Sequence, residues 1–171
     1  MNVAAIAESV SAVTLVIGVG FAVVQVRQTS RRRRHEAVIE LVQSFRTPQF
    51  TEALDHLSQF PPGISDADMR QRMGDRMPLV TGLAGTWEAF GILVFRGDID
   101  IALFEDFFSC PILCSWAVLR DFVMQYRKDT QRETLFEWFQ WLAERVAERE
   151  EYASPVPAHI EHRDWRPARS R

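Results

Sequence analysis

The stretch Ser9–Arg34 reads SVSAVTLVIGVGFAVVQVRQTSRRRR and decides how the rest of the chain is organised. No charged residue lies between Val10 and Val24. A helix of roughly 17 residues covers about 26 Å, which approaches a hydrocarbon core of about 30 Å once the apolar residues just upstream are added. A core helix of a soluble protein keeps a polar face, which this run lacks. The sequence therefore predicts a transmembrane helix over residues 9–26, preceded by a short stub, residues 1–8.

Positive charge follows this run, and no Lys or Arg precedes it. Because the cytoplasmic flanks of membrane helices are enriched in Lys and Arg, we expect the N-terminal stub outside and the rest of the chain in the cytoplasm. A cleavable signal peptide carries its charge in front of the apolar run, so this segment is expected to remain as a single-pass anchor in the cell (inner) membrane. The residues expected to contact lipid headgroups are Arg27, Arg31, Arg32, Arg33 and Arg34.

The arginine run has two other interpretations, contact with an acidic patch on a membrane complex and binding of nucleic acid. A nucleic-acid surface interleaves basic residues with aromatic ones on a folded face, whereas these arginines precede an acidic, apolar helix. The chain as a whole is no polycation, since its net charge is −3. We therefore predict membrane lipids as partners and no nucleic acid.

Small residues recur every fourth position inside the predicted span, at Thr14, Gly18 and Ala22. Such a stripe lets a second helix approach closely in a membrane. We interpret these three residues as candidates for transmembrane helix packing, either in self-association or against a membrane-protein partner. The competing interpretation is that small residues are simply common in membrane helices.

The remainder of the chain has the composition of a folded domain. Twelve Phe and five Trp are a heavy aromatic load, and 25 % of the residues are charged. This composition argues against a disordered segment. We expect one cytoplasmic α-helical domain over residues 27–151 and a flexible, Pro- and Arg-rich tail over residues 152–171.

No segment alternates polar and apolar residues as a strand does, so the predicted fold is all-α. An N-terminal single transmembrane helix continues, to about Arg46, into a cytoplasmic multi-helix domain. Thr47 and Ser65 are expected to cap helix starts. The later helices are expected over Pro78–Phe95, after Asp98, from Pro111, and over Arg132–Glu151 with Thr130 or Asp129 as the cap.

The segment Pro78–Phe95 is expected to be the central helix of the domain. It contains Gly82, Gly85 and Gly91, and each glycine weakens a helix by about 1 kcal/mol relative to Ala. Helices accept that weakness where another backbone comes close, which we predict for this segment. A second membrane span is the alternative, and Glu88 in the middle of the segment argues against it.

Apolar residues at helical spacing predict the inward faces of the last two helices. For the helix from Pro111 these are Leu113, Trp116, Ala117, Val123 and Met124, and for the last helix Leu135, Trp138, Phe139, Leu142 and Val146. Phe136 and Trp141 widen the second face beyond what one neighbouring helix needs. We therefore predict that these two residues dock on a partner.

The central sequence WEAFGILVFRGDIDIALFEDFF, placed after an anchor and before a Trp-containing helix, resembles a family of short bacterial proteins. That family is known only as a membrane-anchored domain of unknown function. The likeness covers most of Arg31 to Glu148. It implies a bacterial inner-membrane protein with a helical cytoplasmic domain, and it brings no activity.

The candidate chemical groups are sparse. Cys110 and Cys114 lack a second ligand pair for zinc, so we expect two small buried thiols in a reducing compartment. His159 and His162 have metal-compatible spacing but lie in the predicted flexible tail. The carboxylates Asp98, Asp100, Glu105 and Asp106 surround a helix start and are interpreted as caps and a solvated face. The sequence predicts no catalytic residue, cofactor or metal site, and no enzyme.

Two classes of function fit these observations. The first is a non-enzymatic accessory, assembly or scaffolding subunit of a membrane complex, docked through its span and its aromatic last helix. The second is a membrane-tethered sensor or regulator whose domain holds a ligand in a pocket lined by Gly82, Gly85 and Trp87. We favour the first, because the chain carries surplus aromatic residues and no recognisable chemistry.

Overall fold

A computed structural model describes residues 21, 25, 43, 47–153 and 156–167 of the chain. Within the predicted span, Phe21 and Gln25 are helical and exposed. The predicted packing residues (Thr14, Gly18, Ala22), the headgroup contacts (Arg27, Arg31, Arg32, Arg33, Arg34) and the expected end of the anchor helix near Arg46 lie outside the described residues.

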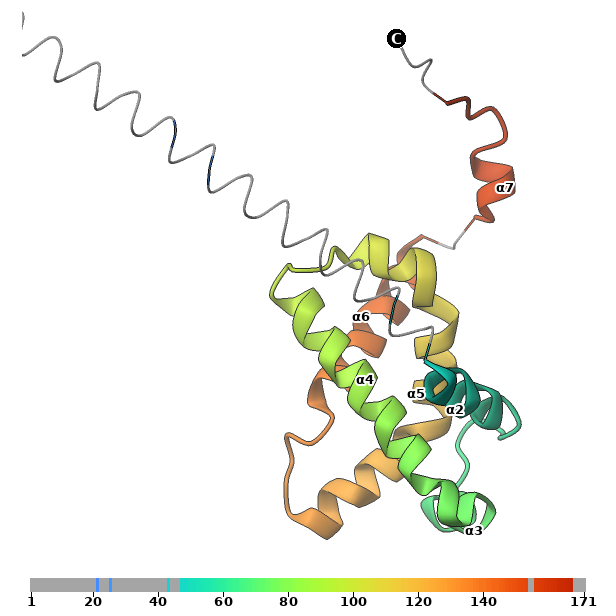
Figure 1. Cartoon of the computed structure of the whole chain (residues 1–171), viewed down its shortest axis with the longest axis vertical. Helices are drawn as coiled ribbons and strands as arrows, with labels where there is room; N and C mark the ends of the chain where they lie inside the picture. The colour runs from blue at the N-terminus through green and yellow to red at the C-terminus, as the bar shows by residue number, and fades with distance from the viewer. Residues whose placement is uncertain (1–20, 22–24, 26–42, 44–46, 154–155, 168–171) are drawn as a thin grey trace, which may run out of the picture.

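The described residues form helices and turns, with no strand among them, which confirms the all-α prediction for this part of the chain. Figure 1 shows four longer helices packed around one another, with the short α3 at one end. The elements are α2 (Pro48–Ser58), α3 (Asp66–Met73), the 3₁₀ turn η1 (Gly74–Arg76), α4 (Met77–Phe95), α5 (Ile101–Thr130), α6 (Glu137–Tyr152) and α7 (Ala158–Glu161). The tail, for which no helix was predicted, thus contains the short α7.

The first two helix starts follow the predicted capping chemistry. The Thr47 hydroxyl oxygen accepts a hydrogen bond from the backbone N–H of Phe50, and Pro48 occupies the first helical position. The Ser65 hydroxyl accepts from the N–H of Asp68 at 3.1 Å. Both caps satisfy backbone donors that a helix start leaves without a partner.

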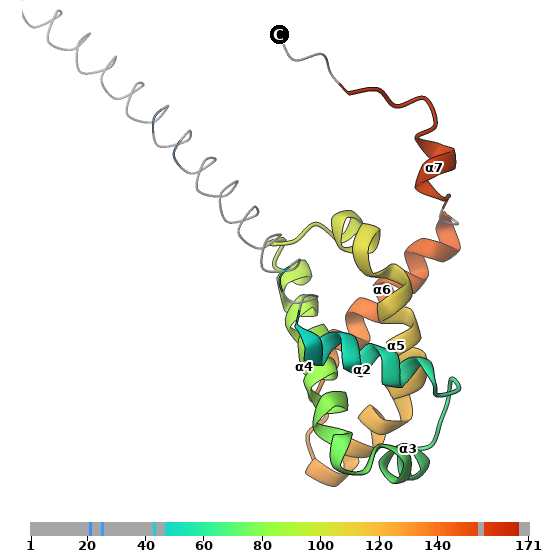
Figure 2. The ribbon, with the colours of Figure 1, turned by 45° about the vertical axis from the view of Figure 1, so that its right-hand side comes forward.

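The core is built around the indole of Trp87, which is fully buried in α4. Five phenylalanine rings surround it with centroid distances of 5.4 to 6.4 Å, and they come from α2, α4, α5 and α6: Phe50, Phe90, Phe104, Phe108 and Phe139. Figure 2 shows α2 lying across α4 and α5, which brings Phe50 onto this cluster. One side chain therefore joins four helices in a single apolar core.

A close contact between helices joins α4 to the first turn of α6. A Cβ atom at Gly91 would lie 2.7 Å from the carbonyl carbon of Trp138 and closer still to its oxygen. The predicted close approach of another backbone is thus confirmed at Gly91. It is wrong at Gly82 and Gly85, where a Cβ atom would meet nothing within 4 Å.

The turn between α4 and α5 differs from the prediction in its cap. Gly97 has the left-handed φ of 73° expected of the residue after a helix end. The connection to the next helix is longer than predicted, because Ile99 is buried in the core before the helix begins. The cap of α5 is therefore Asp100, whose carboxylate accepts from the N–H of Ala102 at 2.9 Å, and Asp98 does not cap the helix.

Pro111 does not start a new helix, contrary to the prediction, but lies inside the single helix α5. A proline inside a helix costs about 3 kcal/mol, because it removes one backbone hydrogen bond. Burial along the whole helix outweighs that cost, and α5 curves around the domain in Figure 1. The buried residues are Phe104, Phe108, Ile112, Ser115, Val118, Leu119, Phe122 and Val123.

Continuity through Pro111 also changes which face of α5 is buried. Of the predicted inward residues, Val123 is buried, Leu113, Trp116 and Met124 are half-buried, and Ala117 is exposed. The rotation of the helix is set by Phe108 and Phe104, which lie one and two turns before Pro111 and contact Trp87. The predicted face started from Pro111 and so missed this constraint.

The last long helix begins at Glu137, five residues later than predicted. Neither Thr130 nor Asp129 caps it, because α5 runs to Thr130, whose hydroxyl donates to the carbonyl of Tyr126. The connecting turn is held by Arg127, whose guanidinium donates to the carbonyl oxygens of Leu135 at 2.7 Å and of Phe136 at 3.2 Å. The predicted inward residues Phe139, Leu142 and Val146 are buried, whereas Leu135 and Trp138 are only half-buried.

Two helical segments, Asp66–Phe95 and Ile101–Thr130, are long and apolar enough to cross a membrane by length and composition. Core helices of soluble proteins meet the same criterion. In this fold both segments supply the core, with Trp87 and Leu83 from the first and Phe104 and Leu119 from the second. The share of the apolar window that is buried is 39 % in the first segment and 28 % in the second.

The contact at Gly91 yields a prediction about stability. Gly91→Ala should lower the free energy of unfolding by about 1 to 3 kcal/mol, because the new methyl group overlaps the backbone of Trp138. Gly85→Ala, in the same helix but facing open space, should raise it by up to about 1 kcal/mol through helix propensity. Chemical denaturation of the full-length protein, followed by circular dichroism, measures both. Equal effects of the two substitutions would contradict the close approach.

Candidate functional site

Three aromatic side chains form a continuous patch where the end of α4 meets the start of α6. Phe95 is 59 % exposed, and Trp138 and Trp141 are half-buried. The ring centroids are 4.6 Å apart for Phe95 and Trp138, 5.8 Å for Phe95 and Trp141, and 5.9 Å for the two tryptophans. We call these three residues the aromatic surface.

The aromatic surface is positioned by a helix cap that comes from another helix. Phe136, at the N-cap position of α6, has a left-handed φ of 55° and makes no side-chain cap bond. The Glu88 carboxylate of α4 takes the place of the missing cap, because it accepts a hydrogen bond from the backbone N–H of Phe139 at 2.8 Å. Since Trp138 precedes Phe139 directly and Trp141 follows it by two residues, this bond sets where both tryptophans lie.

Partial burial raises the pKa of Glu88, and the backbone N–H groups of Phe139 and Trp138 oppose that shift. The hydrogen bonds that make Glu88 a cap therefore keep its carboxylate in a partly buried position, which disfavours the charged form. A negative charge at a helix N-terminus is also favoured by the helix dipole. Glu88 thus contributes to the geometry of α6.

The two predicted docking residues lie in different places. Trp141 belongs to the aromatic surface, whereas Phe136 stacks on Tyr126 with a centroid distance of 6.2 Å at the turn before α6. Both pack partly against the domain's own core. Their docking on a partner stays a prediction.

The sequence pattern gave no prediction for Phe95, and its prediction of Trp138 as an inward residue is wrong, because that indole is only half-buried. The available signal for Phe95 was its position directly before the helix stop Arg96-Gly97, because the last residue of a helix often lies at the edge of the core. No comparable signal existed for Trp138, since its exposure follows from the late start of α6.

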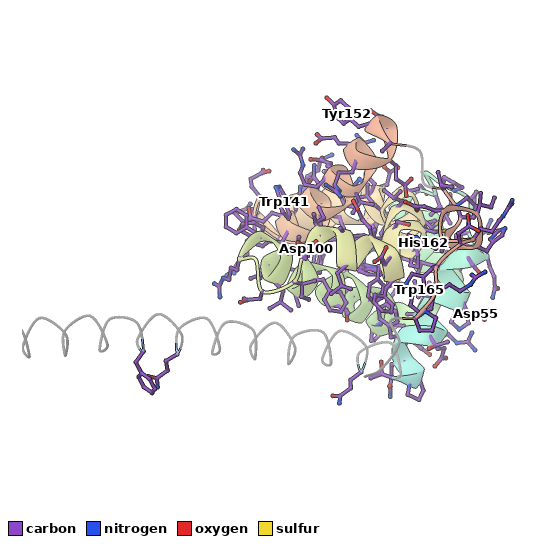
Figure 3. All side chains as sticks on the ribbon, turned by 90° about the horizontal axis from the view of Figure 1, so that it is seen from above. Asp55, Asp100, Trp141, Tyr152, His162 and Trp165 are labelled. Carbon is purple, nitrogen blue, oxygen red and sulfur yellow. The ribbon has the colours of Figure 1, made fainter. Side chains whose placement is uncertain are left out.

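A second site is an apolar hollow between α2 and α5, on other elements than the aromatic surface. Its volume is about 590 Å³. We call it the α2–α5 hollow, and its lining residues are Leu54, Leu57, Ser58, Phe60, Pro62, Cys110, Pro111, Leu113, Cys114, Ser115, Ala117 and Val118. Figure 3 shows Trp141, of the aromatic surface, at the opposite end of the domain from Asp55 of α2.

The thiols of Cys110 and Cys114 are exposed in this hollow, which corrects the prediction of two buried thiols. Because α5 is continuous through Pro111, the two residues share one face of it and their sulfur atoms are 3.7 Å apart. Partial burial and the hydrogen bond with Cys110 raise the pKa of the Cys114 thiol. That thiol is therefore neutral at physiological pH.

The pocket expected around Gly82, Gly85 and Trp87 is not formed by these three residues together. Gly82 lines a smaller hollow of about 390 Å³ between α2 and α4. Gly85 is not among the residues that line it, and Trp87 is buried in the core. The larger and more apolar space lies at α5 instead.

The candidate carboxylates are used locally. Asp100 caps α5, and Glu105 forms an ion pair of 2.6 Å with Arg149 of α6. His159 and His162 lie in and just after α7. In residues 47–153 and 156–167, no group of three His, Cys, Asp or Glu side chains is close enough to hold a metal ion.

Comparison with known proteins identifies a family. Residues 12–146, most of the chain, match the family described as "Domain of unknown function (DUF4760)", so the chain belongs to it. No match was found among curated proteins or among solved structures. This match confirms the predicted resemblance to a family of unknown function.

The Glu88 cap yields a prediction about pH. Glu88→Ala should lower the free energy of unfolding by about 1 to 3 kcal/mol, because the N–H of Phe139 loses its acceptor. The raised pKa of Glu88 means that its contribution is fully present at acidic pH, below the pKa of the unfolded chain, and declines as the pH rises through the folded-state pKa. Glu88→Gln keeps an acceptor without the charge and should remove that decline.

Urea denaturation between pH 4 and pH 8 measures both effects on the full-length protein. Glu151→Gln, which removes an exposed carboxylate at the far end of α6, is the matched control and should leave the pH profile unchanged. A Glu88→Gln variant with the wild-type profile would show that the pH dependence has another source.

Proposed function

We propose that this member of the DUF4760 family is a non-enzymatic, single-pass membrane protein that serves as an accessory, assembly or scaffolding subunit of a membrane complex. Residues 9–26 anchor it in the inner membrane of a bacterium, and the helical domain docks on a partner subunit. The observation that carries the proposal is the aromatic surface formed by Phe95, Trp138 and Trp141.

The aromatic surface has the properties of an interaction site. Tryptophan dominates the binding energy of protein interfaces, where a few large aromatic residues anchor in a partner's pocket. Glu88 and Gly91 fix the start of α6, so the two indoles are held before a partner arrives. Such preorganisation lowers the entropy cost of binding.

The anchor is supported by its sequence. An uncharged apolar run followed by Arg27 and Arg31–Arg34 is typical of a span with its C-terminal side in the cytoplasm. The small residues Thr14, Gly18 and Ala22 would let the span pack against a partner's helix. Docking would then involve two contacts, one in the membrane and one at the aromatic surface.

The non-enzymatic assignment is supported by what the charged side chains already do. Glu88 and Asp100 cap helices, Glu105 pairs with Arg149, and Arg127 holds the turn before α6. Groups engaged in this way stabilise the fold and are not presented to a substrate.

A membrane-tethered sensor is the second candidate function. The observation that favours it is the α2–α5 hollow, whose volume of about 590 Å³ lies within the range of ligand pockets. The hollow and the aromatic surface are on different elements, so the two functions do not exclude each other.

If the aromatic surface docks on a partner subunit, a substitution in that surface should weaken the binding of the partner. Gentle detergent extraction of the tagged protein, followed by mass spectrometry, should recover a stoichiometric set of membrane subunits. Trp141→Ala should weaken that association by about 2 kcal/mol or more, roughly thirtyfold. Trp165→Ala removes an exposed indole in the tail and should retain the partner.

The melting curve of Trp141→Ala, measured by circular dichroism, shows whether the variant is still folded. Recovery of the wild-type protein alone, or only as its own oligomer, would overturn the docking function and leave the sensor.

The anchor predicts a dependence of topology on charge. Replacing Arg31–Arg34 with Gln and Asn should invert or impair insertion, because the positive flank sets the orientation. Labelling of single-cysteine variants in residues 1–8 with a membrane-impermeant reagent on intact cells measures the orientation. Normal topology together with lost retention on DNA would contradict the lipid interpretation of these arginines.

A further inference from the structure

The α2–α5 hollow presents almost only hydrocarbon. Leucines at positions 54, 57 and 113, with Phe60 and Val118, supply most of its wall, and no charged side chain is among its lining residues. An anionic or cationic ligand would lose its hydration there without gaining a counter-charge. The hollow therefore selects against nucleotides, phosphates and carboxylates and in favour of uncharged hydrocarbon.

One polar group in the hollow is left without a hydrogen bond. Ser115 is 1 % exposed, lines the hollow, and its hydroxyl has no partner among the described residues. Serine inside a helix ordinarily bonds back to a carbonyl of the preceding turn, or faces water. The Ser115 hydroxyl does neither, so it is free to form one hydrogen bond with a group placed in the hollow.

The rim of the hollow carries the two thiols of Cys110 and Cys114. Sulfur is polarisable and only weakly hydrogen-bonding, so these thiols pack against hydrocarbon and add no charge. The chain contains two cysteines, and both are at this rim.

We infer that the α2–α5 hollow binds an uncharged, lipid-like molecule with one hydrocarbon chain and one hydroxyl or carbonyl group, which bonds to the Ser115 hydroxyl. The leucine wall accommodates the chain, and the proposed anchor keeps the domain close to the membrane, where such molecules are dissolved. The inference rests on the second candidate function, the sensor, and is independent of docking through the aromatic surface.

The two thiols report directly on occupancy. The full-length protein in lipid nanodiscs is treated with N-ethylmaleimide in the presence of 1-decanol, decane or decanoate, and alkylation of Cys110 and Cys114 is followed by mass spectrometry. 1-Decanol should slow alkylation at least tenfold, decane by much less, and decanoate not at all. An added reference thiol, Arg132→Cys on the exposed turn, should react at the same rate in all three, which excludes an effect on the reagent.

Variants assign the effect to the hollow. Ser115→Ala should abolish the advantage of 1-decanol over decane, because the hydrogen-bonding group is gone. Ala117→Trp places an indole in the hollow and should make alkylation insensitive to 1-decanol. Ala102→Trp, on an exposed part of the same helix, should behave as wild type.

Equal protection by the alcohol and the alkane would overturn the ligand class. No protection by any of the three, or protection that persists in Ala117→Trp, would overturn the site itself. Neither outcome bears on docking, which is measured by recovery of partner subunits.

Discussion

Where α4 meets α6 there is no room for a side chain, and the rest of the domain depends on that contact. Gly91 lets the backbone of Trp138 approach α4, and Glu88, less than one turn earlier, accepts the N–H of Phe139. The two residues fix both the distance between the helices and the rotation of α6. Phe139 then reaches Trp87 in the core, while Trp138 and Trp141 are left at the edge beside Phe95.

The heavy aromatic load of the chain serves two purposes. One group of rings surrounds Trp87 and holds four helices together. A second group, the aromatic surface, is only partly covered, although two of those four helices, α4 and α6, supply it. The cap of α6 separates the two groups of rings. A helix that began at Arg132 would turn Trp138, Phe139 and Trp141 toward other sides of the domain than they face in α6. The same physical feature therefore stabilises the domain and presents its candidate docking site.

The α2–α5 hollow has a different origin. It exists because α5 continues through Pro111, which puts Cys110, Cys114 and Ser115 along one helix opposite α2. A break at Pro111 would have separated these side chains. The aromatic surface lies on α4 and α6 and the hollow on α2 and α5, so the two proposed interactions use different residues.

Local chemistry in the sequence was sufficient for the helical class, the caps at Thr47 and Ser65 and the helix end at Gly97, because each depends on neighbours within about one turn. The continuity of α5, the cap at Asp100, the late start of α6 and the exposure of the two thiols were decided by tertiary structure. In α5, burial of side chains along the whole helix outweighs the local signal of Pro111, which is worth about 3 kcal/mol. Glu88 is the sharpest example, since a carboxylate in an apolar helix gives no indication of the helix, 51 residues away, that it caps.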